Sequence, residues 1–159
     1  MIFPLKEYQY TLPVAGIDPG GFSTKRKYDI HTGVDLYCED GQEVFSMADG
    51  EVVAIENFTG QNAGSPWWED TQAVVVYTNG VGYILYGEIT TNLKPGQQIK
   101  QGELIGLVKK VLKKDKGITP TSMLHMELYS QYNGSVIWYH NEQKPEGLQD
   151  ITQLLKNIL

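Results

Sequence analysis

The sequence predicts an all-β fold built on an antiparallel sheet, with one short helix near the C-terminal end. Three observations carry this prediction: many turn-forming and β-favouring residues, short apolar runs bounded by glycine-containing turns, and one final stretch of helical spacing. The chain has 10 tyrosines, 17 glycines and 7 prolines among 159 residues. This length fits one domain with a sizeable core, so we expect a single domain over residues 1–159.

The clearest strand signal is a hairpin in the middle of the chain. Residues 73–77 and 82–86 are apolar runs separated by Asn79 and Gly80, a pair typical of tight hairpin turns. A second plan occurs twice, over residues 41–55 and 96–108: a Gly-Gln turn, a strand, a Gly-Glu turn and an apolar strand. We interpret these copies as hairpins of related shape, a duplicated motif within one sheet, because a solenoid would need more copies.

The two ends of the chain differ from this β core, which we place at residues 29–130. Residues 1–28 hold three prolines, a Gly-Gly pair and a basic Lys-Arg-Lys run, which predicts an extended arm and an exposed loop that cover part of the core. Within residues 145–159, apolar residues recur at helical spacing. This predicts an amphipathic helix that docks on the domain, with a partner-binding helix as the alternative.

Composition and charge exclude several classes of protein. The net charge of -6 predicts a surface that repels nucleic acid and anionic membranes, and the basic run at residues 109–116 is better explained as a solvated loop than as a polyanion site. The single cysteine, Cys38, excludes an internal disulfide framework. We find neither a signal peptide nor an apolar segment of membrane-spanning length, which predicts a protein made in the cytoplasm, with a phage-borne or separately exported protein as alternatives. Oligomeric state stays open.

His31 and Asp35 form the pattern that indicates a metal site. Zinc needs ligand atoms about 2.0 to 2.2 Å from one centre, whereas residues four apart on a straight strand lie roughly 13 Å apart. The chain must therefore bend, and Gly33 between them can adopt such a bend. Of the two other histidines, His125 lies in a short apolar run that predicts a buried strand, whereas His140 lies in a polar stretch and is the poorer third ligand. A turn histidine beside a solvated aspartate is the simpler alternative.

A glycine-rich loop at residues 59–68 ends in two adjacent tryptophans, Trp67 and Trp68. On a strand their side chains would point to opposite faces, so at most one would normally lie in the core. They indicate either an aromatic rim beside a groove or an ordinary half-buried clamp.

The motifs and their order resemble those of the lysostaphin and LytM-like zinc endopeptidases. The resemblance covers residues 29–130 and rests on His-Thr-Gly-Val-Asp-Leu at residues 31–36, the glycine-punctuated strands that follow, the stretch at 93–106, and Leu-His-Met-Glu at 124–127. It implies an antiparallel sheet crossed by a groove, and hydrolysis of peptide cross-links in bacterial cell walls. It also implies one Zn²⁺ bound by three side chains, His31, Asp35 and His125, and it places the two tryptophans beside the groove.

Two histidines of that family correspond to other residues in this chain. The first histidine of a His-x-His motif corresponds to Met123, whose thioether has no transferable proton, and the histidine of a Tyr-x-His motif corresponds to Glu88, two residues after Tyr86. Tyr86 and Met123 are accordingly expected to line the substrate groove. A carboxylate can act as general base in zinc peptidases, so Glu88 is the predicted catalytic residue. As a fourth ligand, Glu88 would instead close the metal shell.

Two functional hypotheses follow. The first is a zinc metallopeptidase that cleaves peptidoglycan cross-links with Glu88 as base. The second is a zinc-binding, non-catalytic domain whose groove binds a peptide, a glycan or a protein partner. A carrier or phosphotransfer module is a weaker third reading, because no exposed lysine occupies a hairpin tip and Met123 replaces the histidine that a phosphotransfer pair would need.

Overall fold

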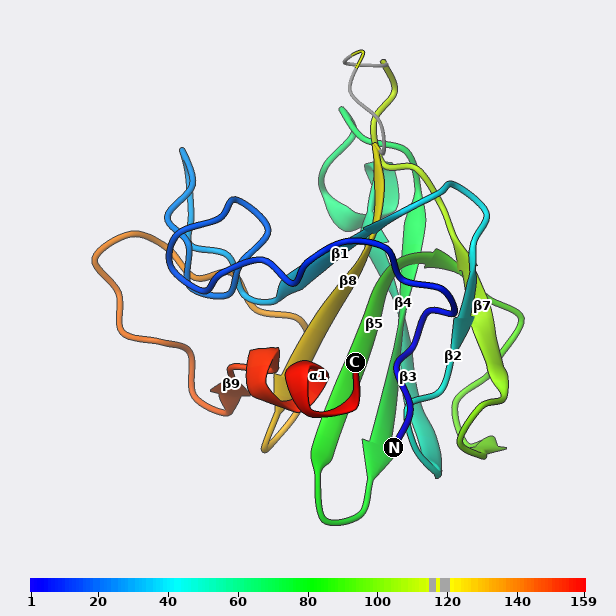
Figure 1. The fold of residues 1–159 in the computed structure, drawn as a ribbon. Coiled ribbons are helices and arrows are strands. Elements are labelled where there is room, and N and C mark those ends of the chain that lie inside the picture. Colours follow the sequence, from blue (N-terminus) through cyan, green and yellow to red (C-terminus); the bar gives the residue numbers. More distant parts are fainter. Residues whose placement is uncertain (115–116, 118–120) are drawn as a thin grey trace.

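A computed structural model of the chain describes residues 1–114, 117 and 121–159. Its strands form one antiparallel sheet in the order β1-β8-β5-β4-β3-β6, with β2 paired to β7, β7 also paired to β5, and β9 paired to β8 (Figure 1). The predicted all-β class and the short C-terminal helix are therefore confirmed. The strands are β1 (Val34–Cys38), β2 (Glu43–Phe45), β3 (Gly50–Thr59), β4 (Thr71–Thr78), β5 (Gly82–Thr90), β6 (Gln98–Ile99), β7 (Leu104–Val108), β8 (Ser122–Tyr129) and β9 (Leu148–Gln149).

The predicted central hairpin is confirmed as β4 and β5. The chain turns at Gly80, whose φ of 79° favours glycine, and the two strands pair along their length. Strand β8 then lies between β5 and β1, so that Asp35 of β1 and Gly87 of β5 both lie opposite His125 of β8. Residues directly opposite one another in a sheet share a face, so the topology brings one predicted ligand next to another.

The duplicated motif is present, but its strands pair differently from the prediction. Instead of closing two separate hairpins, β2 pairs with β7 and β3 pairs with β6, so each copy contributes one strand to each pairing. The chain bends at residues 47–49, between β2 and β3. Backbone hydrogen bonds tie Ser46 to Glu103 and Gly102, which hold the bend of one copy against the bend of the other.

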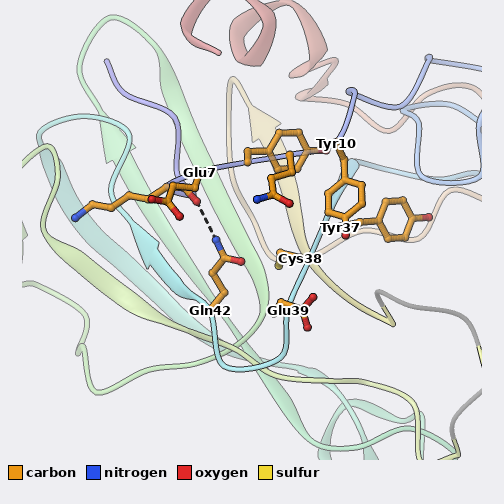
Figure 2. Close-up of a pocket in the computed structure, with 9 residues that line it drawn as sticks. Glu7, Tyr10, Tyr37, Cys38, Glu39 and Gln42 are labelled. Atoms are coloured by element: carbon orange, nitrogen blue, oxygen red, sulfur yellow. Dashed lines mark hydrogen bonds between the residues drawn. The ribbon is translucent and has the colours of Figure 1, made fainter.

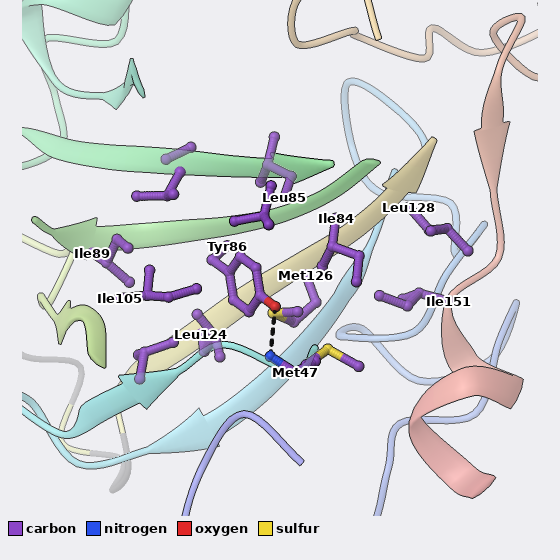
Figure 3. Packing of buried hydrophobic residues seen from close by; sticks show 14 of the residues in the cluster. Met47, Ile84, Leu85, Tyr86, Ile89, Ile105, Leu124, Met126, Leu128 and Ile151 are labelled. Atoms are coloured by element: carbon purple, nitrogen blue, oxygen red, sulfur yellow. Dashed lines mark hydrogen bonds between the residues drawn. The ribbon is translucent and has the colours of Figure 1, made fainter. Parts of the chain in front are cut away.

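One face of the sheet carries the apolar core. Residues of alternate parity on β1, β5 and β8 pack there. The close-up in Figure 3 shows Ile105, Leu124 and Met126 beside the ring of Tyr86. The Tyr86 hydroxyl accepts a hydrogen bond from the backbone N–H of Met47 at 2.9 Å, which satisfies the one polar group of that ring. Burying this face supplies the main apolar contribution to stability.

Both ends of the chain pack against this core. The N-terminal arm runs across β1 in Figure 1, and it buries Leu5 and Phe22. The helix α1 (Thr152–Ile158) docks through Leu155, but it begins later than residue 145 because residues 148–149 pair with β8 as β9. Within the described part of the chain, no helix combines the length and the apolar character needed to span a membrane.

Candidate metal centre

Three buried side chains meet on the face of the sheet opposite the core. Asp35 Oδ1 lies 2.8 Å from His125 Nδ1 and 3.3 Å from His31 Nε2, and the two histidine nitrogens lie 3.2 Å apart. Each residue offers one ligand atom, and these atoms all lie within 4.8 Å of one another. The pairing of β1 with β8 places Asp35 beside His125, and the loop before β1 supplies His31.

Hydrogen bonds to the outer ring nitrogens orient both histidines. His31 Nδ1 lies 2.9 Å from the carbonyl oxygen of Gly21, which can only accept, so this nitrogen carries the proton and Nε2 faces the centre. His125 Nε2 donates to the Glu127 carboxylate at 2.8 Å, which leaves Nδ1 facing the centre. Glu127 also accepts hydrogen bonds from the hydroxyls of Thr32 and Tyr129. Such outer partners fix the tautomer and orientation of metal-binding histidines.

The electrostatics of the cluster are those of closely packed opposite charges. Burial alone would lower the pKa of His125, but hydrogen bonds and charge interactions with Asp35 and Glu127 outweigh it and raise that pKa to about 10. Burial alone would raise the pKa of Asp35, but hydrogen bonds from His125 and His31 hold it well below its ordinary value. The pKa of Glu127 is likewise lowered, because the hydrogen bond from His125 outweighs burial. Without metal, an imidazolium therefore holds the two carboxylates together.

The distances between these atoms match those required by a small divalent ion. Four-coordinate zinc with bonds of about 2.0 to 2.1 Å holds its ligand atoms roughly 3.3 Å apart. The observed separations of 2.8, 3.2 and 3.3 Å fall near this value. Two imidazoles and one carboxylate oxygen also form a donor set that zinc prefers. The residues present therefore fit the metal, and the three side chains predicted as ligands come together.

Gly33 is required here for a different reason from the predicted bend. Its φ is not positive, but a Cβ placed on it would lie 2.3 Å from the Met126 carbonyl oxygen and 2.9 Å from two atoms of the His125 ring. A glycine therefore lets the loop carrying His31 approach β8 closely. The spacing of the motif depends on this close contact rather than on unusual backbone angles.

Glu88 lies at a β-bulge on β5. Val74 lies opposite Tyr86 and Gln72 lies opposite Ile89, so Gly87 and Glu88 together face the single residue between Val74 and Gln72. Glu88 has φ of 62°, an uncommon value for a residue with a side chain. Its Oε2 is buried, with no hydrogen-bond partner among the described residues. Burial and the charge of Asp35 raise the pKa of Glu88 to about 8, although His125 and Arg26 act in the opposite direction.

Comparison with known families identifies the fold and its motif. The model of peptidase family M23 matches residues 29–138. This chain belongs to peptidase family M23. No curated protein sequence gives a significant match.

Solved structures show the same fold for this M23 domain. A zinc-containing peptidase from Vibrio cholerae is 22% identical with a TM-score of 0.56, over 80% of this chain and 36% of that protein. The catalytic domain of lysostaphin from Staphylococcus simulans is 21% identical with a TM-score of 0.55, over 93% of this chain and 90% of that domain. LytU is 15% identical with a TM-score of 0.59, over 96% of this chain and 92% of that one. This M23 chain therefore spans about a third of the Vibrio protein but nearly all of the lysostaphin domain.

Tyr86 and Met123 occupy different environments in this M23 domain. Met123 of β8 lies opposite Tyr37 of β1 and shares strand parity with His125. It is therefore placed on the metal-binding face, where it is half-buried. Tyr86 is 0% exposed and its hydroxyl is bonded within the core, so the prediction that it contacts substrate is wrong. The bulge explains the error. In a regular strand Glu88 and Tyr86 would lie on the same face, but the extra residue breaks this alternation.

The tryptophan loop connects the end of β3 to the start of β4 and presents both rings to solvent. Trp67 is 64% exposed and Trp68 is 39% exposed, with ring centroids 5.9 Å apart. A bridge joins Trp68 to Leu112, and Lys113 Nζ donates to the Pro66 carbonyl at 2.8 Å. The basic run therefore contacts this loop through its described part, whereas residues 115–116 of the run lie outside the described residues. The contact of these tryptophans with a ligand stays a prediction.

Several residues near the centre carry no signal in the sequence. Phe58 of β3 lies against the His125 ring, with centroids 5.4 Å apart, and it can do so because Gly87 leaves the space that a Cβ would fill. Arg26 Nη2 donates to Asp35 Oδ2 at 2.9 Å from the N-terminal segment. Glu127 alone had a readable clue, because it follows His125 by two residues and so shares its face. His140 bonds backbone carbonyls of Arg26 and Asp29, which agrees with its rank as the poorer ligand.

A separate cavity of about 270 Å³ lies between the N-terminal arm and the edge of β1 (Figure 2). None of the predicted site residues lines it. Tyr37 links this cavity to the metal centre, because it shares strand parity with Asp35 and its pKa is raised by burial and by the charges of Asp35 and Glu88. The lining residues are Lys6, Glu7, Tyr8, Gln9, Tyr10, Tyr37, Cys38, Glu39 and Gln42.

Proposed function

We propose that this chain is a zinc-dependent endopeptidase domain that hydrolyses peptide cross-links of bacterial cell walls, with Glu88 as general base. One observation carries the proposal: a converging set of two imidazoles and one carboxylate lies within the electrostatic reach of Glu88, a carboxylate whose buried oxygen lacks a partner. Membership of a peptidase family supports the reaction class. The cell-wall substrate is taken from the resemblance to lysostaphin.

The metal ligands would be His31 Nε2, Asp35 Oδ1 and His125 Nδ1. Bound zinc would polarise the scissile carbonyl and lower the pKa of water. Gly21 and Glu127 hold the two histidine rings so that the correct nitrogen faces the ion. Three protein ligands leave room in a four-coordinate shell, which is the arrangement of catalytic rather than structural zinc.

Glu88 would accept a proton during attack on the peptide carbonyl. Its Oε2 has no competing hydrogen bond among the described residues. The pKa of about 8 applies to the protein without metal, where burial and Asp35 disfavour the charged form. A divalent cation would act in the same direction as Arg26 and lower this pKa, toward the range suited to a base near neutral pH.

The same unpartnered oxygen supports a second candidate, in which Glu88 is a fourth ligand. The shell would then be closed, and the groove would bind a peptide, a glycan or a protein partner without cleaving it. The two candidates differ in what the loss of the Glu88 charge should do. A base is needed for turnover alone, whereas a ligand is needed for metal affinity.

The test is Glu88→Gln, with Glu43→Gln on the exposed end of β2 as a matched control. If Glu88 is the base, the variant keeps zinc affinity and melting temperature while hydrolysis of cross-linked wall fragments falls about a hundredfold or more. Zinc content, thermal unfolding and release of new amino groups measure these three quantities. Weaker zinc binding with a lower melting temperature and no activity in the wild type would support the ligand role instead.

A double variant, Glu88→His with Met123→His, separates the candidates further. If the wild-type chain cleaves wall peptides and the double variant does no better, the carboxylate suffices for catalysis. If cleavage appears only in the double variant, the wild-type domain is a binding module and the enzyme proposal is wrong.

A further inference from the structure

Arg26 contacts the metal centre from outside the family match. It lies in residues 1–28, whereas the M23 match begins at residue 29. Its Nη2 donates to Asp35 Oδ2 at 2.9 Å and to the Pro19 carbonyl at 3.0 Å. Asp35 is 4% exposed and Arg26 is 42% exposed, so the bond joins a buried carboxylate to the surface of the N-terminal segment.

The two oxygens of Asp35 are thereby assigned to different partners. Oδ1 is the atom nearest both histidine nitrogens, at 2.8 and 3.3 Å, whereas Oδ2 is held by the guanidinium. A carboxylate can bind a metal through one oxygen or through both. A charged donor on Oδ2 opposes the second mode, because that oxygen would have to give up a charge-assisted hydrogen bond to reach the ion.

The backbone around Arg26 holds it in place. Arg26 N donates to the Asp29 carbonyl at 2.8 Å, and His140 Nε2, 2.7 Å from the Arg26 carbonyl and 3.1 Å from that of Asp29, must carry the proton and donate to both. The same segment also bonds directly to the ligand loop, since Ser23 N donates to the His31 carbonyl. Arg26 is thus pre-positioned, unlike an exposed ion pair between two free side chains, which contributes little.

We propose that Arg26 is a positioning residue that restricts Asp35 to metal binding through Oδ1 alone and so keeps a coordination position free. This inference rests on the three-ligand site of the proposed function. It assigns to the N-terminal segment a part in the metal centre beyond covering the core.

The experiment replaces zinc with Co²⁺, whose visible absorption weakens as the number of ligand atoms rises above four. Arg26→Ala is compared with Lys25→Ala, which removes the same charge from the same segment at an exposed residue, whereas Arg26 is the residue that bonds to Asp35. We expect Arg26→Ala to weaken the visible bands and to raise the zinc Kd about tenfold to a hundredfold, as loss of an outer partner does. Lys25→Ala should match the wild type. Arg26→Lys, which retains a charged donor, should restore part of the spectrum.

Circular dichroism and thermal unfolding of each variant show whether the fold is kept. If Arg26→Ala does not fold, the same cobalt spectrum is measured on Arg26→Lys and Arg26→Gln instead. Equal spectra for Arg26→Ala and Lys25→Ala would overturn the proposal. A higher zinc Kd with an unchanged spectrum would also overturn it, since that pattern indicates lost stability or charge alone. Failure of the wild type to bind cobalt or zinc would instead contradict the ligand set, and with it both proposals.

Discussion

The two faces of β8 are stabilised in opposite ways. Leu124 and Met126 point into the apolar core and are 0% exposed, whereas His125 and Glu127, their immediate neighbours, point into a buried polar cluster. The apolar face depends on close packing and loses stability when buried volume is removed. The polar face depends on hydrogen bonds and balanced charge, in which every group needs its partner. One strand of eight residues thus contributes side chains both to the apolar core and to the candidate metal centre.

This contrast predicts which substitutions should have effects on stability that depend on metal. A defect in the core should cost the same with or without zinc, because the metal does not touch that face. A defect in the polar cluster should remove the stabilisation that zinc provides.

The largest expected effect is that of Leu124→Ala. It removes a fully buried side chain and should lower the free energy of unfolding by about 2–5 kcal/mol. Chemical denaturation with zinc and with a chelator measures this loss. The loss should be equal in both conditions, and a loss present in only one of them would contradict the separation of the two faces.

His125→Ala should abolish the response to metal. We expect about one zinc per wild-type chain and a zinc Kd raised by more than about a hundredfold in the variant, above the range for outer partners. Zinc should raise the melting temperature of the wild type and of Leu124→Ala, but not that of His125→Ala. Full zinc content in His125→Ala, or in His31→Ala, would show that the ligand assignment is wrong.

The pH dependence of the metal-free protein should expose the charge balance of the cluster. The pKa of His125 is raised from 6.5 to about 10, so its stabilising contribution is complete below pH 6.5 and is lost as the pH rises through about 10. The pKa of Glu88 is raised from 4.5 to about 8, so its ionisation also lowers the stability of the fold as the pH rises, but that loss is complete near pH 8. Melting temperatures in chelator should therefore still fall between about pH 8 and 10.

His125→Ala is the control for this pH profile, since it should flatten the fall above pH 8. Zinc-loaded protein should also lack that fall, because a metal-bound His125 stays neutral. An unchanged slope in His125→Ala would assign the fall to other groups.

The smallest effect on stability is expected for Trp67→Ala. Its ring is 64% exposed, so the free energy of unfolding should change by less than about 0.5 kcal/mol. If the ring borders the groove, wall fragments should quench tryptophan fluorescence in the wild type and quench it less in the variant, with Trp138 as internal reference. Equal quenching in both proteins would refute the groove contact.

The sequence was sufficient to predict the sheet and the central hairpin, and the three side chains predicted as ligands do converge. These features depend on local patterns: alternation, an Asn-Gly turn and a short motif around Gly33. Tyr86 was misplaced because a bulge at Gly87 and Glu88 breaks the alternation, and no local pattern announces a bulge. The pairing of β2 with β7 depends likewise on where two distant bends meet.

Arg26 shows the other limit of local reasoning. The Lys-Arg-Lys run around it reads as a solvated loop, and its two flanking lysines are exposed. Nothing in the spacing distinguishes the middle residue, because its contact with Asp35 arises only when residues 25–30 fold back and bond to His140. A contact set by three separate segments cannot be found in any one of them.

The bonds from His140 bear on how this domain can be cut and recombined. Residues 29–138 match the family, yet a fragment with these limits would lack both Arg26 and the imidazole that fastens its backbone. The fragment would contain all three candidate metal ligands, but the Asp35 carboxylate would lose its outer donor. Grafts of this domain into a chimaera should therefore include Pro19, Arg26 and His140, which carry these hydrogen bonds, rather than stop at the limits of sequence similarity.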